Sequence, residues 1–97
     1  MFAQVRYLLR SKTDGQYLVA RPRLKTGETA LKYLLIFQEH FDALSYLNTH
    51  GKAMAENFAV ESVSGAQLKS ILQRWGFQGV GLVQDPLIPR IQFLSSL

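Results

Sequence analysis

The sequence predicts an α+β domain, an α/β sandwich in which two helices pack on a mixed β-sheet. Segments rich in aromatic, β-branched and leucine residues recur along the chain, and two segments between them carry apolar residues at helical spacing. The connections are short, and no low-complexity stretch separates them. The expected order is β-β-β-α-β-α-β-β, and the helices pack on one face of the sheet or are divided between both. Residues 1–97 are expected to form one domain.

The chain is expected to open with a β-hairpin. Residues 2–10 alternate as a strand does. Asp14-Gly15 is a favoured pair for a two-residue hairpin turn, because both central positions of that turn need positive φ, which this pair accommodates. A second strand starts at Tyr17, and it either is an edge strand or ends at Pro22, since proline lacks the N–H group that a strand interior uses.

The middle of the chain predicts a buried strand followed by a helix. The sequence ALKYLLIF at residues 30–37 is nearly continuous in apolar residues, which is typical of a central strand covered on both faces. A helix is expected over 39–50, because Phe41, Leu44 and Leu47 recur at three-residue spacing.

The C-terminal part predicts strands at 57–63, 79–86 and 91–95 and a helix at 64–76. The helix has the clearest local signal, because Ser64 followed three positions later by Gln67 is a capping box. Gly79 and Gly81 indicate close backbone packing in the strand that follows.

The composition limits the classes of function. Cysteine is absent, which excludes disulfides, thiolate metal sites and a cysteine nucleophile, and which fits a reducing cytoplasm. Arg6 and Arg10 interrupt the apolar pattern that a signal peptide would need. No apolar run approaches the roughly 20 residues of a membrane span. We therefore expect a cytoplasmic protein with no membrane partner.

Positive charge is concentrated in the N-terminal third. Residues 1–32 hold seven Lys or Arg against two acidic residues, a net charge of +5, whereas residues 33–97 carry −1. In the expected hairpin, side chains alternate between two faces. One face is apolar and is expected to face the core: Val5, Tyr7, Leu9, Leu18, Ala20 and Pro22. The other is expected to be exposed and basic: Arg6, Leu8, Arg10, Lys12, Tyr17, Val19, Arg21 and Arg23.

This basic face is the candidate binding site, with Arg6, Arg10, Lys12, Tyr17, Arg21 and Arg23 as the contact residues. The expected register places Arg6 opposite Arg23, and contacts with carboxylate or phosphate would offset their repulsion. An acidic protein surface is the first expected partner. The alternative is RNA or DNA, with the cations on phosphates and Tyr17 stacked on a base. A third interpretation is a solvated edge strand whose charge discourages aggregation.

No catalytic site, cofactor or metal site is expected, so we do not expect an enzyme. His40 and His50, the only histidines, lie ten positions apart on the expected helix, about 15 Å by helical rise, so they cannot share a metal ion. The glycines of 76–81 follow a helix and precede a strand, the reverse of the order in phosphate-binding loops. Glu39 and Asp42 suit a helix N-terminus.

Two further interaction surfaces stay open. Residues 84–90, QDPLIPR, form either a rigid loop or a partner-binding loop that presents Leu87 and Ile88. A homodimer could pair through the last strand at Ile91 and Phe93.

Part of the chain resembles a known family. The stretches LLIFQEHFDALSYLNTHG, VESVSGAQLKSIL and GVGLVQDPLIP resemble the N-terminal domain of the SseB-like (enhanced serine sensitivity protein) family over about residues 31–95. The matching positions are Phe37, Ser64-Gly65, Leu68, and Gly81 to Pro86. The chain departs from the family by lacking an opening helix, and by having Asp85-Pro86 where the family has Asn-Pro. The resemblance implies a compact α/β interaction module and supplies no catalytic residues.

Overall fold

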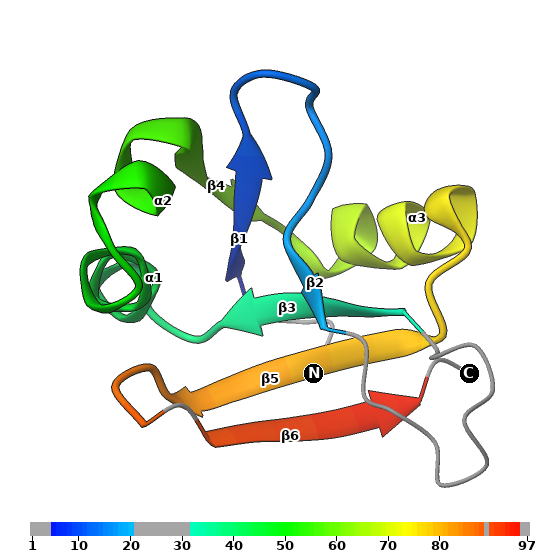
Figure 1. The fold of residues 1–97 in the computed structure, drawn as a ribbon. Coiled ribbons are helices and arrows are strands. Elements are labelled where there is room, and N and C mark those ends of the chain that lie inside the picture. The colour runs from blue at the N-terminus through cyan, green and yellow to red at the C-terminus, as the bar shows by residue number, and fades with distance from the viewer. Residues whose placement is uncertain (1–4, 21–31, 89, 96–97) are drawn as a thin grey trace, which may run out of the picture.

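The computed structural model describes residues 5–20, 32–88 and 90–95. Two of the expected contact residues, Arg21 and Arg23, lie outside these ranges, as does Pro22. The elements in chain order are β1 (Arg6–Ser11), β2 (Val19–Ala20), β3 (Tyr33–Phe37), α1 (His40–Thr49), α2 (Lys52–Asn57), β4 (Phe58–Val63), α3 (Gly65–Trp75), β5 (Gly79–Asp85) and β6 (Arg90–Ser95). Figure 1 shows their arrangement and confirms the α+β class.

The strands form one mixed sheet in the order β4-β1-β3-β5-β6, and β2 pairs with β3. β3 and β5 are parallel, whereas the other pairs are antiparallel. β1 pairs with β4 from Arg6↔Val63 to Ser11↔Phe58, and it meets β3 at Tyr7↔Phe37. β1 therefore lies inside the sheet, and the interpretation of the opening strand as a solvated edge is wrong.

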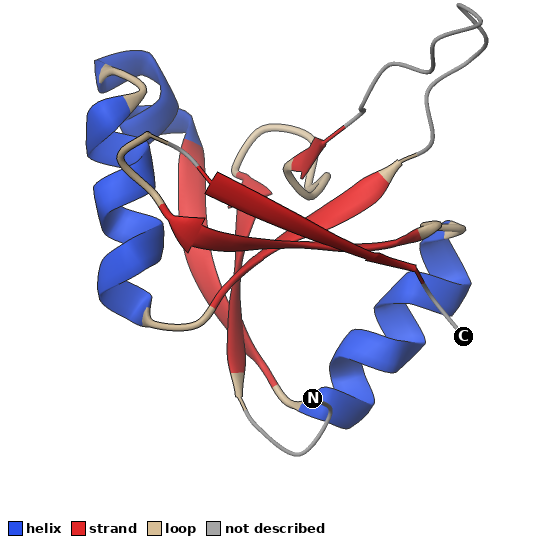
Figure 2. Cartoon of the chain, turned by 90° about the horizontal axis from the view of Figure 1, so that it is seen from below, coloured by secondary structure: helices blue, strands red, loops and turns tan. Residues whose placement is uncertain are grey.

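The helices are divided between the two faces of the sheet, as Figures 1 and 2 show. α3 packs on one face and buries the α3-side core: Leu8, Leu34, Ile36, Val63, Leu68, Leu72, Phe77, Val80 and Leu82. α1 and α2 pack on the other face, over the α1-side core: Leu9, Leu35, Phe37, Ala43, Leu47 and Val83. Consecutive residues of β1 and β3 alternate between the two cores, so both strands are covered on both faces.

The sequence signals around α3 are confirmed in detail. The Ser64 side chain accepts a hydrogen bond from the Gln67 N–H at 3.2 Å, and the Gln67 side chain accepts one from the Ser64 N–H at 2.8 Å. α3 ends at Gly76, which has a left-handed backbone. At Gly81, a Cβ atom would lie 3.0 Å from Leu35 Cδ2, so the absence of a side chain permits the close packing.

One helix is not predicted from the sequence. α2 follows α1 directly after Gly51, where its first turn is closed by a hydrogen bond from the Ala55 N–H to the Gly51 carbonyl. Its six residues are too few to show an apolar period, so no helical pattern stands out. The expected element order is therefore correct apart from this added helix.

The expected two-residue turn at Asp14-Gly15 is wrong. The Ser11 N–H donates to the Gln16 carbonyl at 2.8 Å, so residues 12–15 form a longer turn. Gly15 supplies the positive φ of 73° that this turn needs, and the Asp14 carboxylate accepts the Gln16 N–H at 3.0 Å. Arg10 consequently lies opposite Tyr17 rather than Val19. This shift of two positions keeps the alternation of side chains between faces.

The expected exposure of the basic hairpin face is also wrong for Leu8, Tyr17 and Val19. Leu8 is fully buried beneath α3, and Tyr17 and Val19 pack partly buried against the same α3-side core. The reason is that α3 packs over the face of β1 that holds Leu8, so this face does not reach solvent. The opposite face packs on the α1-side core through Leu9 and, in part, Tyr7, Leu18 and Ala20, as predicted. Val5, expected in the core, is 52% exposed.

Candidate functional site

Arg10 is held by contacts within the chain. Its Nε donates to the Gly15 carbonyl at 2.8 Å, and its Nη1 lies 3.5 Å from Glu61 Oε2. Its guanidinium carbon lies 4.9 Å from the centre of the Tyr17 ring, a cation–π contact. Because both partners of the ion pair are near 40% exposed, at 41% and 38%, the pair contributes little stability. Glu61 does, however, neutralise part of the positive charge of Arg10, which the sequence analysis expects to contact a partner.

The other described cations of the hairpin are separated from Arg10. Arg6 lies at the start of β1, beyond Leu8, and its Nη1 is 3.4 Å from the Val5 carbonyl. Its Nε is buried with no hydrogen-bond partner in the described part of the chain. Lys12 is exposed on the turn, which is fixed to the end of α2 by a hydrogen bond of 2.8 Å from the Lys12 N–H to the Asn57 carbonyl. The structure thus does not gather Arg6, Arg10 and Lys12 into one open face.

Tyr17 is placed where the hairpin meets α3. Its ring packs edge-on against Trp75, with 5.1 Å between ring centres. Burial raises the pKa of the Tyr17 phenol above its usual value, and the nearby negative charge of Glu61 raises it further. Tyr17 is therefore a neutral, half-buried ring that joins β2 to the end of α3.

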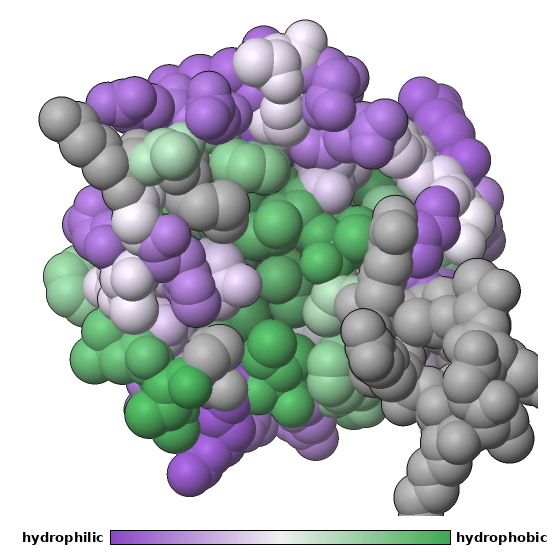
Figure 3. All heavy atoms as spheres, viewed as in Figure 1, coloured by the Kyte–Doolittle hydropathy of each residue, from purple (hydrophilic) through white to green (hydrophobic). Residues whose placement is uncertain are grey.

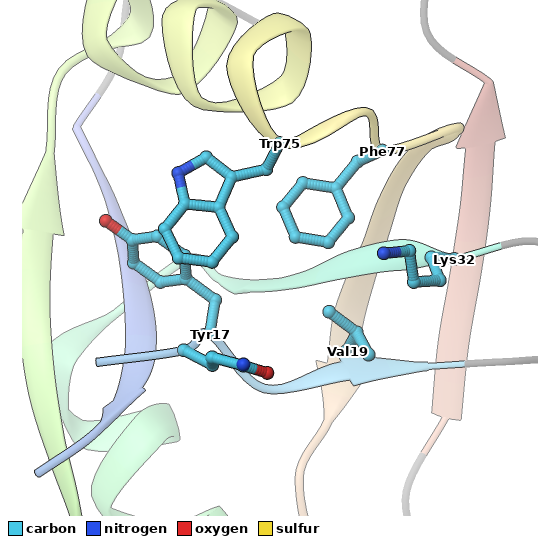
Figure 4. Close-up of a pocket in the computed structure, with 6 residues that line it drawn as sticks. Tyr17, Val19, Lys32, Trp75 and Phe77 are labelled. Atoms are coloured by element: carbon cyan, nitrogen blue, oxygen red, sulfur yellow. The ribbon is translucent and has the colours of Figure 1, made fainter. Parts of the chain in front are cut away.

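Beside Tyr17 there is an aromatic hollow of about 50 Å³ between β2 and α3 (Figure 4). Its lining residues are Gln16, Tyr17, Val19, Lys32, Trp75 and Phe77. The rings of Trp75 and Phe77 are nearly parallel, 6.4 Å apart, and the Lys32 Nζ lies 5.8 Å from the Phe77 ring centre. Gln16 and Lys32 are exposed, so the hollow combines an aromatic wall with a polar, cationic rim.

Backbone hydrogen bonds fix this hollow. The Phe77 N–H donates to the Leu72 carbonyl at 3.0 Å at the end of α3, and the Gln78 N–H donates to the Lys32 carbonyl at 2.9 Å before β3. The second bond ties the residue before β5 to the residue before β3. The hollow is not predicted from the sequence, because Tyr17 and Trp75 are far apart in the chain and no local pattern joins them.

The histidines and acidic residues of α1 have structural surroundings. His40 packs edge-on against Tyr7 at 5.6 Å, and His50 lies 4.2 Å from the Tyr46 ring centre. Glu39 is the N-cap residue of α1, and Asp42 lies in its first turn. No group of three or more His, Cys, Asp or Glu side chains in the described ranges could hold a metal ion. None of the described helices has the length and apolar character to cross a membrane.

Exposed hydrophobic residues lie elsewhere on the surface. Leu87 and Ile88, in the turn between β5 and β6, are 65% and 63% exposed, and Phe41 on α1 is 73% exposed. Figure 3 shows hydrophobic side chains at the end of the molecule where this turn lies. The Leu87 N–H donates to the Asp85 carboxylate at 2.9 Å, which fixes the turn. The rigid-loop and partner-binding interpretations of residues 84–90 both remain open.

The last strand contributes one side chain to the core and one to the surface. Ile91 packs partly buried against the α1-side core. Phe93 is 42% exposed and contacts the Tyr33 ring at 5.0 Å. A homodimer through this strand stays a prediction, and of these two residues Phe93 has the more accessible side chain.

Comparisons with protein families, characterised proteins and solved structures found no match to this chain. The resemblance to the SseB-like family therefore stays a prediction from the sequence.

Proposed function

We propose that this chain is a non-catalytic interaction module of the cytoplasm, related to the SseB-like domains, that binds an acidic segment of a partner protein. The binding site is the basic turn surface, which we define as Arg10, Lys12, Gln16, Tyr17 and Lys32. Arg21 and Arg23 extend this site in the proposal, on the evidence of the sequence alone, whereas Arg6 lies apart from it at the start of β1.

The observation that carries the proposal is the position of Lys32 at the rim of the aromatic hollow. Interfaces between proteins are enriched in tyrosine, tryptophan and arginine, and their strongest contacts are apolar anchors surrounded by polar groups. Exposed cations of the basic turn surface lie beside partly buried rings, Tyr17 within that surface and Trp75 in the adjoining hollow. A charged surface that contacts only solvent would not require aromatic rings beside its cations.

Lys12 and Lys32 carry most of the attraction to an acidic partner. The Arg10–Glu61 contact is the ion pair found among the described residues, and it involves neither lysine. Asp14 lies on the same turn, but its carboxylate already accepts a hydrogen bond from the Gln16 N–H at 3.0 Å, which lowers its pKa. The two lysines can therefore pair with carboxylates that a partner supplies.

The test is affinity capture from a lysate of the source organism. Wild-type protein is compared with Lys12→Glu/Lys32→Glu and with the control Lys69→Glu/Arg90→Glu, which places the same charge change at exposed positions on α3 and β6. We expect wild type and control to retain the same acidic proteins and the first variant to lose them, with and without nuclease. Equal retention by all three would refute the proposal. Retention abolished by nuclease would establish the nucleic-acid alternative.

A further inference from the structure

We propose that the aromatic hollow binds one aliphatic side chain of the partner, and that the residue next to this side chain is acidic and pairs with Lys32. This inference rests on the proposed function and names the recognition element that the basic turn surface accepts. The ligand is thus a short segment with a Leu, Ile, Val or Met beside Asp or Glu.

The size of the hollow indicates which partner side chain can enter it and act as the anchor. A volume of about 50 Å³ holds roughly three to five water molecules. That space matches an aliphatic group of about four heavy atoms, whereas a nucleobase or an aromatic side chain has about seven or more. Drug-sized ligands need several hundred Å³. A single aliphatic side chain therefore fits the hollow.

The lining of the hollow selects the same chemistry. Tyr17, Trp75 and Phe77 offer ring surfaces on which an aliphatic group replaces water favourably. Phe77 is 8% exposed, so it forms the floor of the hollow, while Tyr17 and Trp75 are only partly buried and form its walls. These rings supply the apolar part of the lining, and Gln16 and Lys32 supply its polar part.

The positive charge at the rim of the hollow indicates which kind of partner residue lies next to the aliphatic anchor. The Lys32 Nζ is the cationic group that the rim presents, 5.8 Å from the Phe77 ring centre. A cationic ligand would be repelled by this ammonium group, although aromatic walls alone would accept one. A carboxylate next to the aliphatic anchor would instead form a charge-assisted hydrogen bond with Lys32.

Gln16 provides a way to close the hollow without disturbing the core. Its side chain is exposed and lines the hollow, and its backbone N–H and carbonyl make the hydrogen bonds of the turn. Gln16→Phe would fill the hollow from the rim, and Gln16→Ala is the matched control that leaves it open. Thermal unfolding of both variants verifies that they fold like wild type.

The experiment is a selection from a displayed library of random peptides, on wild type, Gln16→Ala, Gln16→Phe and Lys32→Gln. We expect wild type and Gln16→Ala to enrich peptides with an aliphatic residue beside Asp or Glu. Binding of the best peptide is then measured by the emission of Trp75, the single tryptophan, which lines the hollow. We expect Gln16→Phe, or Ala in place of the anchor in the peptide, to weaken binding at least about tenfold. Lys32→Gln should weaken it about two- to fivefold.

Failure of this inference can be told apart from failure of the proposed function. Acidic peptides with no preferred aliphatic position, or unchanged affinity in Gln16→Phe, would overturn the role of the hollow and leave the acidic partner in place. Aliphatic peptides with no acidic residue would overturn the acidic partner. A Trp75 emission that does not change on saturation with the peptide would also overturn the role of the hollow.

Discussion

Replacing Leu8 by alanine should strongly destabilise the protein. Leu8 is fully buried in the α3-side core, between the positions of Arg6 and Arg10 on β1. Truncation of a buried leucine costs about 3–5 kcal/mol, from lost burial and from the cavity that remains. A domain of this size has roughly 5–15 kcal/mol of stability in total. With a urea slope of about 1.5 kcal/mol per M, the unfolding midpoint should fall by about 2 M or more.

Urea unfolding followed by Trp75 fluorescence measures this effect. Leu9→Ala should cost a similar amount, because Leu9 is fully buried on the opposite face of β1. Leu87→Ala is the matched control, since Leu87 is 65% exposed and its truncation should change stability by less than about 0.5 kcal/mol. If Leu8→Ala unfolded at the same urea concentration as Leu87→Ala, this face of β1 would be solvated, and the packing of α3 over it would be wrong.

Three further outcomes are expected. Gly81→Ala should destabilise by about 1–3 kcal/mol in urea unfolding, since its Cβ atom would lie 3.0 Å from Leu35 Cδ2; an unchanged midpoint would contradict this close packing. Ser64→Ala removes the capping box and should cost about 1 kcal/mol, whereas Ser64→Asp, which keeps an acceptor, should cost less. The folded state binds the Tyr17 proton more tightly than the unfolded state, so this group stabilises the fold below pH 10.0, and the stabilisation is lost as the pH rises through the raised pKa. The phenolate absorbance of wild type, compared with that of Tyr17→Phe, should show that Tyr17 ionises at a higher pH than an ordinary tyrosine. Glu61→Gln should lower the pH of this ionisation. Titration at the ordinary tyrosine pKa would contradict the burial of this ring.

Local signals explain why the C-terminal part of the fold could be predicted. Ser64 and Gln67 are three positions apart, and they alone specify where α3 begins. The apolar run that contains β3 likewise indicates burial on both faces, and Leu34 to Phe37 are all buried. In these segments, each residue and its immediate neighbours determine the structure.

The hairpin could not be predicted as well, because its environment depends on distant segments. The alternation of Arg6, Leu8 and Arg10 predicts an exposed face only if the strand has one face in water. α3, whose residues lie more than 50 positions later, covers that face of β1 instead. The turn differs because the Asp14 carboxylate and Gly15 support a longer loop than the two-residue type.

Of the described site residues that the sequence predicts, Tyr17 lines the hollow, and its part in binding stays a prediction. Trp75, Lys32 and Phe77 carry no local signal of a shared site. Their proximity arises from the end of α3 meeting β2 and the start of β3, which is a property of the tertiary structure.

The most direct test of the acidic-partner proposal is a map of backbone amide chemical shifts during titration with the peptide Glu-Glu-Leu-Glu-Glu. We predict that the shifts concentrate at residues 10–19, at Lys32 and at residues 75–77, with a shift of the Trp75 indole N–H. The same titration with Lys-Lys-Leu-Lys-Lys should leave these signals in place. Shifts concentrated instead at Phe41 and at Leu87 and Ile88, which are the most exposed large apolar side chains among the described residues, would contradict the account. So would the absence of a difference between the two peptides.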